Sequence, residues 1–300
     1  MWIYFGLLAA LFLSVNAICR KRSVKGNALF PVLFISNGIS TLVIAPIFIG
    51  SFFYPELLQK AGMYISDIAI QDHFFIGIKS LIMTCSWVLT FYALKHLPIT
   101  IVAPIRAAGP FFTFLGAIII YRENPSLLQW IGFFLIVISM LAYSRVGKKE
   151  GIIFKNNKGI FAIVGATFLG ASSGLYDKFL FQYQHYEVLT VQWWFFFYVT
   201  LFMFLLVYFV YLPRKKEMGE FKWHWSIAAI GVLMILADYF YFRGLQDPEV
   251  LIMLMSALKR SQILFTVVIG GFIFKEKNKK LKLIPLLGVM LGVLCLMYSA

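Results

Sequence analysis

The chain has 300 residues, of which 61% are apolar or aromatic and 13% are charged, with a formal net charge of +14. A soluble domain is roughly half apolar and about a quarter charged, so this composition excludes a water-soluble globular protein. The positive charge does not indicate a nucleic-acid partner, because the basic residues lie between apolar runs, as in the cytoplasmic loops of membrane proteins.

The apolar residues form long, unbroken runs. About 20 residues of helix cross a hydrocarbon core roughly 30 Å thick, whereas a membrane barrel would show short segments of alternating polarity. We therefore expect an all-α membrane protein of about ten transmembrane helices. The expected spans are 2–19, 28–53, 73–94, 99–121, 126–144, 159–181, 187–212, 224–243, 249–273 and 283–299. The first run lacks the basic start of a signal peptide, so we expect it to be the first helix.

Charge alternates between the connections. The connections rich in Lys and Arg are 20–27, 145–158, 213–223 and 274–282. The connection 54–72 is mainly acidic, and 182–186 and 244–248 contain no Lys or Arg. The positive-inside rule places the basic connections in the cytoplasm. We therefore expect a multi-pass protein of the plasma (inner) membrane with both termini outside.

The two halves of the chain contain similar segments. Phe112-Thr113-Phe114 through Tyr121-Arg122-Glu123 resembles Phe265-Thr266-Val267 through Phe274-Lys275-Glu276, and the same offset carries Arg106 onto Lys259. We therefore expect two five-helix repeats, 1–150 and 151–300, together forming one transmembrane domain. Because five crossings are an odd number, the second repeat must be inverted. Inverted repeats are typical of secondary transporters, which hold substrate near the midplane of the membrane.

With this plan the chain resembles the drug/metabolite transporter superfamily, of the EamA type, over essentially its full length. The similarity also rests on Tyr92-Ala93-Leu94-Lys95-His96-Leu97-Pro98, before the fourth span, and on the ends of the fourth and ninth spans quoted above. The resemblance implies a transporter but does not specify its substrate. Most members of the family have cytoplasmic termini, which conflicts with the orientation that the charges predict.

A narrower similarity concerns two short basic segments. Arg106-Ala107-Ala108-Gly109-Pro110-Phe111-Phe112 and Leu258-Lys259-Arg260 resemble phosphate-binding segments of the plastid sugar-phosphate translocators. This similarity implies that Arg106, Lys259 and Arg260 contact an anionic substrate.

Charged residues inside a span are costly and indicate a functional site. Arg106 lies about seven residues into its span, and Lys259 lies about ten residues into the ninth span, with Ser256 and Arg260 beside it. We expect these residues to hold an anionic group, although structural ion pairs with Asp238 or helix carbonyls are the alternative. Asp238 is the acid well inside the eighth span. It is a candidate for proton coupling or, equally, a static partner of Lys259 or Arg243.

Other residues are expected either in the cavity or in ordinary packing roles. The polar or amphipathic candidates for lining the cavity are Asn16, Trp87, Tyr92 and Tyr176; for each, helix packing is the alternative. Lys79, Asp177 and Lys178 are expected near span ends, with their charges reaching toward water.

Two further patterns concern the surfaces of the helices. The aromatic run 193–198 is expected to face lipid or the interface. The glycines at 170 and 174, and at 288 and 292, predict close helix packing within the chain, with a homodimer as the alternative.

The expected function is a secondary transporter that moves a small polar or anionic metabolite by alternating access. The alternatives are an exporter of neutral amino acids or amphipathic compounds, and a receptor or scaffold that transports nothing. The sequence has no metal-ligand cluster and no nucleophile beside a base, and Cys19, Cys85 and Cys295 lack metal or redox spacing. We therefore expect no enzyme activity and no cofactor, and the lipid bilayer and a small solute as partners.

Overall fold

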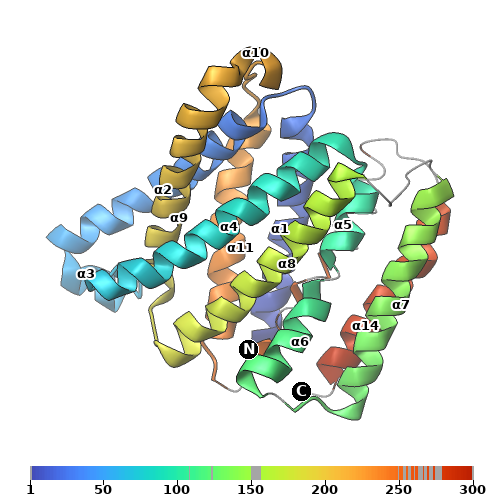
Figure 1. The fold of residues 1–300 in the computed structure, drawn as a ribbon. Coiled ribbons are helices and arrows are strands. Elements are labelled where there is room, and N and C mark those ends of the chain that lie inside the picture. The colour runs from blue at the N-terminus through green and yellow to red at the C-terminus, as the bar shows by residue number, and fades with distance from the viewer. Residues whose placement is uncertain are drawn as a thin grey trace.

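The computed structural model describes residues 2–107, 109–122, 124–149, 157–248, 250–252, 255, 258–259, 261–262, 266, 269, 273 and 279–298. These residues form helices joined by short connections (Figure 1). The helices of the first half are α1 (Trp2–Val24), α2 (Leu29–Phe53), α3 (Pro55–Lys60), α4 (Ile70–His96), α5 (Ile99–Ala107), α6 (Gly109–Tyr121) and α7 (Leu127–Lys149). The helices of the second half are α8 (Lys158–Lys178), α9 (Val188–Leu206), α10 (Lys215–Met218), α11 (Trp225–Leu245) and α14 (Lys279–Tyr298). A π-helical turn, Phe179–Tyr183, extends α8, and another, Val207–Tyr211, extends α9.

The helices match the expected spans closely, and the predicted all-α membrane fold is confirmed. Within the described ranges, six helices are long and apolar enough to cross a membrane. The expected span 99–121 corresponds to α5 and α6, with residue 108 outside the described part. Most of the expected ninth span, 249–273, also lies outside the described residues. The short helix α3 lies within the acidic connection 54–72.

The two halves interleave. Helix α1 packs along α11, α4 along α8, α2 along α9, and α7 along α14 (Figure 1). Each pair joins one helix of the first half to one of the second. If each helix is replaced by the helix at the same position in the other half, the pair α1 and α11 becomes the pair α8 and α4. The pairs α2 with α9 and α7 with α14 stay the same. This pattern is the one that two inverted repeats produce.

Small residues allow several of these helices to approach closely. A Cβ added at Gly292 would lie 2.7 Å from the carbonyl oxygen of Gly132 on α7, and one at Gly231 would lie 2.4 Å from that of Ser36 on α2. A Cβ at Gly288 would lie 2.1 Å from Ser139 Oγ. The predicted intramolecular packing of the glycines at 288 and 292 is therefore confirmed. By contrast, Gly170 and Gly174 lie beside the Arg106 and Tyr241 side chains rather than against a neighbouring backbone.

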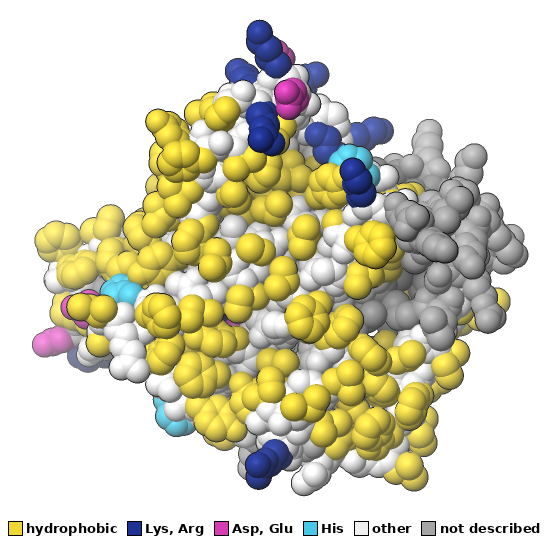
Figure 2. Space-filling view, in the orientation of Figure 1, with side chains coloured by type: hydrophobic (Ala, Val, Ile, Leu, Met, Phe, Trp, Pro, Cys, Tyr) yellow, Lys and Arg dark blue, Asp and Glu magenta, His cyan; other side chains and the backbone are white. Residues whose placement is uncertain are grey.

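The surface is largely apolar along the helices and basic at one end. Large apolar side chains such as Leu42, Ile119 and Phe209 are exposed on the flanks, where lipid would cover them. Lys and Arg gather at the end that carries α10 (Figure 2); Arg214, Lys215 and Lys216 there are exposed. The start of α1 and the end of α14 lie at the opposite end of the molecule (Figure 1).

The expectation that the aromatic run 193–198 faces lipid is largely wrong. Trp193, Phe195 and Phe196 are buried, and Phe197 is 40% exposed. The reason is that α9 packs against α2 on one side and α4 on another, so most of its circumference is covered. Trp193 stacks on Phe48 of α2, with ring centroids 4.4 Å apart.

Candidate functional site

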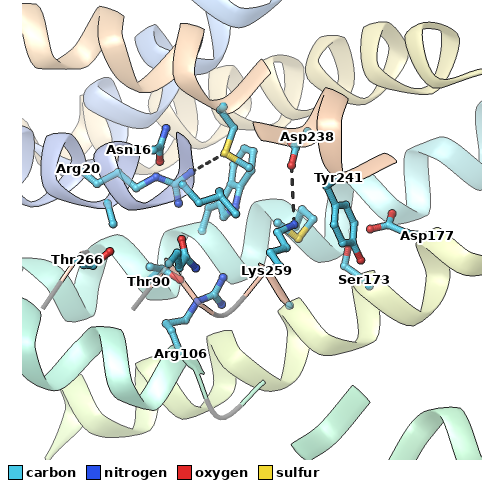
Figure 3. Close-up of a pocket in the computed structure, with 18 of the residues that line it drawn as sticks. Asn16, Arg20, Thr90, Arg106, Ser173, Asp177, Asp238, Tyr241, Lys259 and Thr266 are labelled. Atoms are coloured by element: carbon cyan, nitrogen blue, oxygen red, sulfur yellow. Dashed lines mark hydrogen bonds and ion pairs between the residues drawn. The ribbon is translucent and has the colours of Figure 1, made fainter. Parts of the chain in front are cut away.

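A buried cavity lies at the centre of the helix bundle (Figure 3). Its volume of about 120 Å³ leaves room for several water molecules or one small solute. Helices α1, α4, α5 and α6 of the first half and α8, α9 and α11 of the second contribute to its wall, as do three described residues of the ninth span, Lys259, Gln262 and Thr266. Both halves of the chain therefore meet at this cavity.

The wall carries an unusual number of charges for the interior of a membrane protein. Four cationic side chains, Arg20, Lys79, Arg106 and Lys259, line the cavity together with two carboxylates, Asp177 and Asp238. Moving a charge out of water costs several kcal/mol unless partners compensate it. The partners of each charged group therefore indicate what it does.

Lys79 and Asp177 form an ion pair across the contact between α4 and α8. Both are buried, and the Lys79 ammonium also lies over the rings of Phe195 and Phe242, 5.0 and 4.2 Å from their centroids. Lys178 is buried too. The expectation that Lys79, Asp177 and Lys178 reach toward water was wrong. The side of α8 that bears them is covered, because the helix continues through Tyr183 and packs on α4 and α6.

Lys259 lies between Asp238 and Tyr241. Its Nζ is 4.0 Å from Asp238 Oδ1 and 3.8 Å from the centroid of the Tyr241 ring (Figure 3). Asp238 is 4% exposed, and its α11 neighbours on the cavity wall are Met234, Tyr241 and Phe242. Lys259 and Asp238 both line a solute-sized space, where a solute group or a proton can compete for their contact.

Arg106 connects α5 to α8 while lining the cavity. Its Nη1 donates to the carbonyl oxygen of Ala166 at 2.6 Å and to Ser86 Oγ at 3.2 Å. A Cβ added at Gly170 would lie 3.0 Å from the same nitrogen, so a larger residue there would press on the guanidinium. Arg106 thus has a packing role as well as access to the cavity.

Arg20 is the cation that sequence reasoning missed, since it was assigned to the connection 20–27. Helix α1 runs on to Val24, and Arg20 is 8% exposed. Its guanidinium lies over Trp87 and Phe91, with Cζ 5.3 Å from each ring centroid. The signal was present in the spacing: Leu13, Asn16, Ala17 and Arg20 recur at helical intervals and all line the cavity. Lys79, Met83 and Trp87 repeat this pattern on α4.

The structure brings together only some of the predicted site residues. Asn16, Trp87, Arg106, Asp238 and Lys259 line the cavity. Asn16 also donates from Nδ2 to the carbonyl oxygen of Ile230 at 2.8 Å, which fixes α1 to α11.

The remaining predicted site residues lie elsewhere. Tyr92 and Tyr176 lie away from the described wall: the ring of Tyr92 packs on His96, and that of Tyr176 on Phe179. Ser256 and Arg260 lie outside the described residues.

Two interleaved, inverted sets of apolar helices around a central cavity are typical of integral, multi-pass membrane transporters of small molecules. The model of the EamA-like transporter family matches the chain twice, over residues 1–145 and 157–298. The chain therefore belongs to the EamA-like transporter family, and the two-repeat architecture expected from the sequence is confirmed.

Comparisons with individual proteins give the fold but no substrate. A solved structure titled only "Crystal structure of protein" superposes with a TM-score of 0.73 and 14% sequence identity, covering 100% of this chain and 99% of its own. At that identity the likeness shows the shared fold alone. No curated protein matches the chain.

Proposed function

We propose that this protein is a secondary transporter of the plasma membrane that moves a small polar solute with an anionic group by alternating access. The observation that carries the proposal is the charge of the cavity wall. Four cationic side chains and two carboxylates line one solute-sized space to which both repeats contribute. The described wall therefore has two more positive than negative groups.

An excess of buried positive charge favours an anionic solute. Each uncompensated charge in a low-dielectric interior is costly, and an anion entering the cavity offsets that cost. Charge-assisted hydrogen bonds from Arg or Lys to a carboxylate or phosphate are about twice as strong as neutral ones. Arg106 from the first repeat and Lys259 from the second offer such bonds from different sides of the cavity (Figure 3).

The interleaved halves support the proposal of alternating access. In transporters built from inverted repeats, one repeat rocks against the other around a fixed central site. The pairs α1 with α11 and α4 with α8 contribute much of the described wall. A relative movement within these pairs would open the cavity toward one side of the membrane and close it toward the other.

Asp238 is the candidate for proton coupling. It lines the cavity, is buried, and lies 4.0 Å from the ammonium of Lys259, its ion-pair partner among the described residues. A solute anion that engages Lys259 would weaken this contact and leave the carboxylate to take up a proton. Binding of the anion and of the proton would thereby favour each other.

A second candidate substrate is an amino acid or an amphipathic compound. The cavity wall also contains Trp87, Phe195, Tyr241 and Phe242, which offer apolar surface, and the two carboxylates can receive an ammonium group. A zwitterion would use both kinds of charge at once.

The test is a thermal-shift screen of the purified protein with matched compounds. Each acid is paired with its primary amide and each phosphate ester with its parent alcohol, so that the members of a pair differ in the anionic group. A ligand at 100 times its Kd stabilises the folded state by about 2.7 kcal/mol. The proposal predicts that the anionic member raises the melting temperature more. If only neutral or cationic compounds do so, the anion proposal fails.

A further inference from the structure

Arg20 differs from the other cations of the cavity in its partners. The described contacts of its guanidinium are the faces of Trp87 and Phe91 and the sulfur of Met234, which is 3.1 Å from Nη2. A thioether is a weak acceptor. The Nε atom is buried and has no hydrogen-bond partner among the residues that the structure describes.

The other three cations each have an oxygen partner in the described structure. Lys79 pairs with Asp177, Lys259 lies 4.0 Å from Asp238, and Arg106 donates to a backbone carbonyl. Behind Arg20, a small second cavity is bounded by Ser36, Asn37 and Ser40 of α2. Each of these side chains donates to a backbone carbonyl of α2, and none accepts a hydrogen bond from Arg20 in the described contacts.

The carboxylate of Asp238 attracts this guanidinium, but among the described residues no oxygen atom accepts a hydrogen bond from it. An ionised group that is removed from water without hydrogen-bonding partners is destabilised, and arginine does not deprotonate in proteins. Cation–π contacts with two rings offset part of that cost. The rest remains until an acceptor arrives, and the large cavity, which Arg20 also lines, is where it can arrive (Figure 3).

We propose that Arg20 is the residue that selects the anionic group of the solute. Its planar guanidinium, a fork of N–H donors, binds two oxygens of a carboxylate or phosphate. This inference rests on the proposed function and adds the chemistry of selection. Bidentate geometry is specific to arginine with these oxyanions. With a neutral amide or a halide, some N–H donors of the guanidinium have no acceptor. Sites built to hydrogen-bond a particular group reject analogues that lack it. Arg106 and Lys259 then attract the anion and hold other parts of the solute.

The experiment uses the full chain in detergent with two probes, sodium phosphate and sodium acetate, each compared with sodium chloride at equal ionic strength. Wild type is compared with Arg20→Met and Arg20→Lys. The controls are Arg22→Met and Arg22→Lys, because Arg22 lies two residues away on α1 and is exposed. Stabilisation by salts excluded from the protein surface affects all variants equally and cancels in the comparison.

The inference predicts that phosphate, acetate or both raise the melting temperature of wild type above chloride. Arg20→Met should lose this difference, and its melting temperature without ligand should stay the same or rise, because a desolvated charge has been removed. Arg20→Lys keeps the charge but loses the fork, so the apparent Kd should rise about ten- to a hundredfold. Both Arg22 variants should behave as wild type. Trp87, under the guanidinium, gives a second readout: the anion-dependent change in fluorescence should vanish in Trp87→Phe.

Two results would overturn the inference. One is an oxyanion response of Arg20→Lys equal to that of wild type, which decides the matter even where Arg20→Met does not fold. The other is an equal response of wild type to chloride, phosphate and acetate. Transport of an anionic solute that survives in Arg20→Lys would refute the role of Arg20 while leaving the proposed function intact. Absence of transport of any solute by wild type would refute the proposed function itself.

Discussion

Lys79 of α4 and Asp177 of α8 form an ion pair with almost no access to water, since the two residues are 1% and 4% exposed. The pair joins a helix of the first repeat to a helix of the second, at the wall of the central cavity. It therefore links the two repeats in the conformation described, and it places a compensated charge beside the space where the solute is expected.

Breaking this pair should destabilise the protein strongly. Lys79→Met leaves Asp177 buried without its cation, and removing one partner of a buried pair costs about 3–5 kcal/mol. The double variant with Lys79→Met and Asp177→Leu should recover most of that loss, because neither charge remains. Melting temperatures in detergent measure both effects, with Lys60→Met on the exposed face of α3 as control. A Lys79→Met variant as stable as the control would show that the pair contributes little.

Asp238 should make transport depend on a pH gradient. We expect Asp238→Asn to reach the membrane folded but to lose this dependence, because an amide cannot take up the proton that a carboxylate exchanges. The measurement is uptake into proteoliposomes with and without an imposed pH gradient, with a protonophore to collapse it. Asp67→Asn, at an exposed position in the connection 54–72, is the matched control. Wild-type pH dependence in Asp238→Asn would assign the carboxylate a structural role with Lys259.

Both termini should face the outside of the cell. The basic connections 20–27 and 213–223 lie at one end of the molecule, and the start of α1 and the end of α14 lie at the other (Figure 1). The positive-inside rule places the basic end in the cytoplasm. Tags at either terminus should be accessible to antibody in intact cells, and a tag inserted in the connection 213–223 should not. Protected terminal tags would mean that the usual family orientation holds.

Tyr186 should stabilise the connection before α9 in a pH-dependent way. Its hydroxyl donates to Asp72 at the start of α4, and burial together with this bond raises the pKa of Tyr186. Because the folded pKa is above the ordinary value of about 10, the contribution is present below about pH 10 and lost as pH rises through the folded pKa.

The expected size is modest, since Tyr186 is only partly buried. We expect Tyr186→Phe to lose about 0.5–1 kcal/mol at neutral pH, allowing for screening by solvent. The difference in melting temperature from wild type should narrow above about pH 10. Tyr183→Phe removes an exposed hydroxyl and should show no such trend. A Tyr186→Phe deficit that stays constant to pH 11 would contradict the assignment.

The fold was predictable because few kinds of fold can cross a membrane. Runs of apolar residues set the helices, and the similar segments 112–123 and 265–276 indicated the repeats. The ends of the helices were less certain, since the chain can continue as helix beyond the apolar run. Helix α1 was expected to end at residue 19 and continues to Val24. That error moved Arg20 from the cavity wall into a connection.

The site was predictable only where a charge stood deep within an apolar run. Arg106, Lys259 and Asp238 met that condition, and all three line the cavity. Lys79 and Asp177 were expected at the span ends with their charges reaching water, although Lys79 lies about as far into its expected span as Arg106 does. Packing between α4 and α8 buries both residues, and which helix covers which face cannot be read from one helix alone.

Counterflow in proteoliposomes tests the central claim, that the cavity carries an anionic solute across the membrane. Vesicles loaded with an unlabelled acid from the matched screen receive the same acid in labelled form outside. Wild type should transiently accumulate the labelled acid, and the same experiment with the paired amide in labelled form should give little accumulation. Lys259→Gln should reduce the initial rate at low concentration about ten- to a hundredfold, as the loss of a charge-assisted bond implies, and Lys259→Arg should retain more of it. An acid that binds but gives no counterflow would indicate a receptor, and equal counterflow of acid and amide would contradict the anionic site.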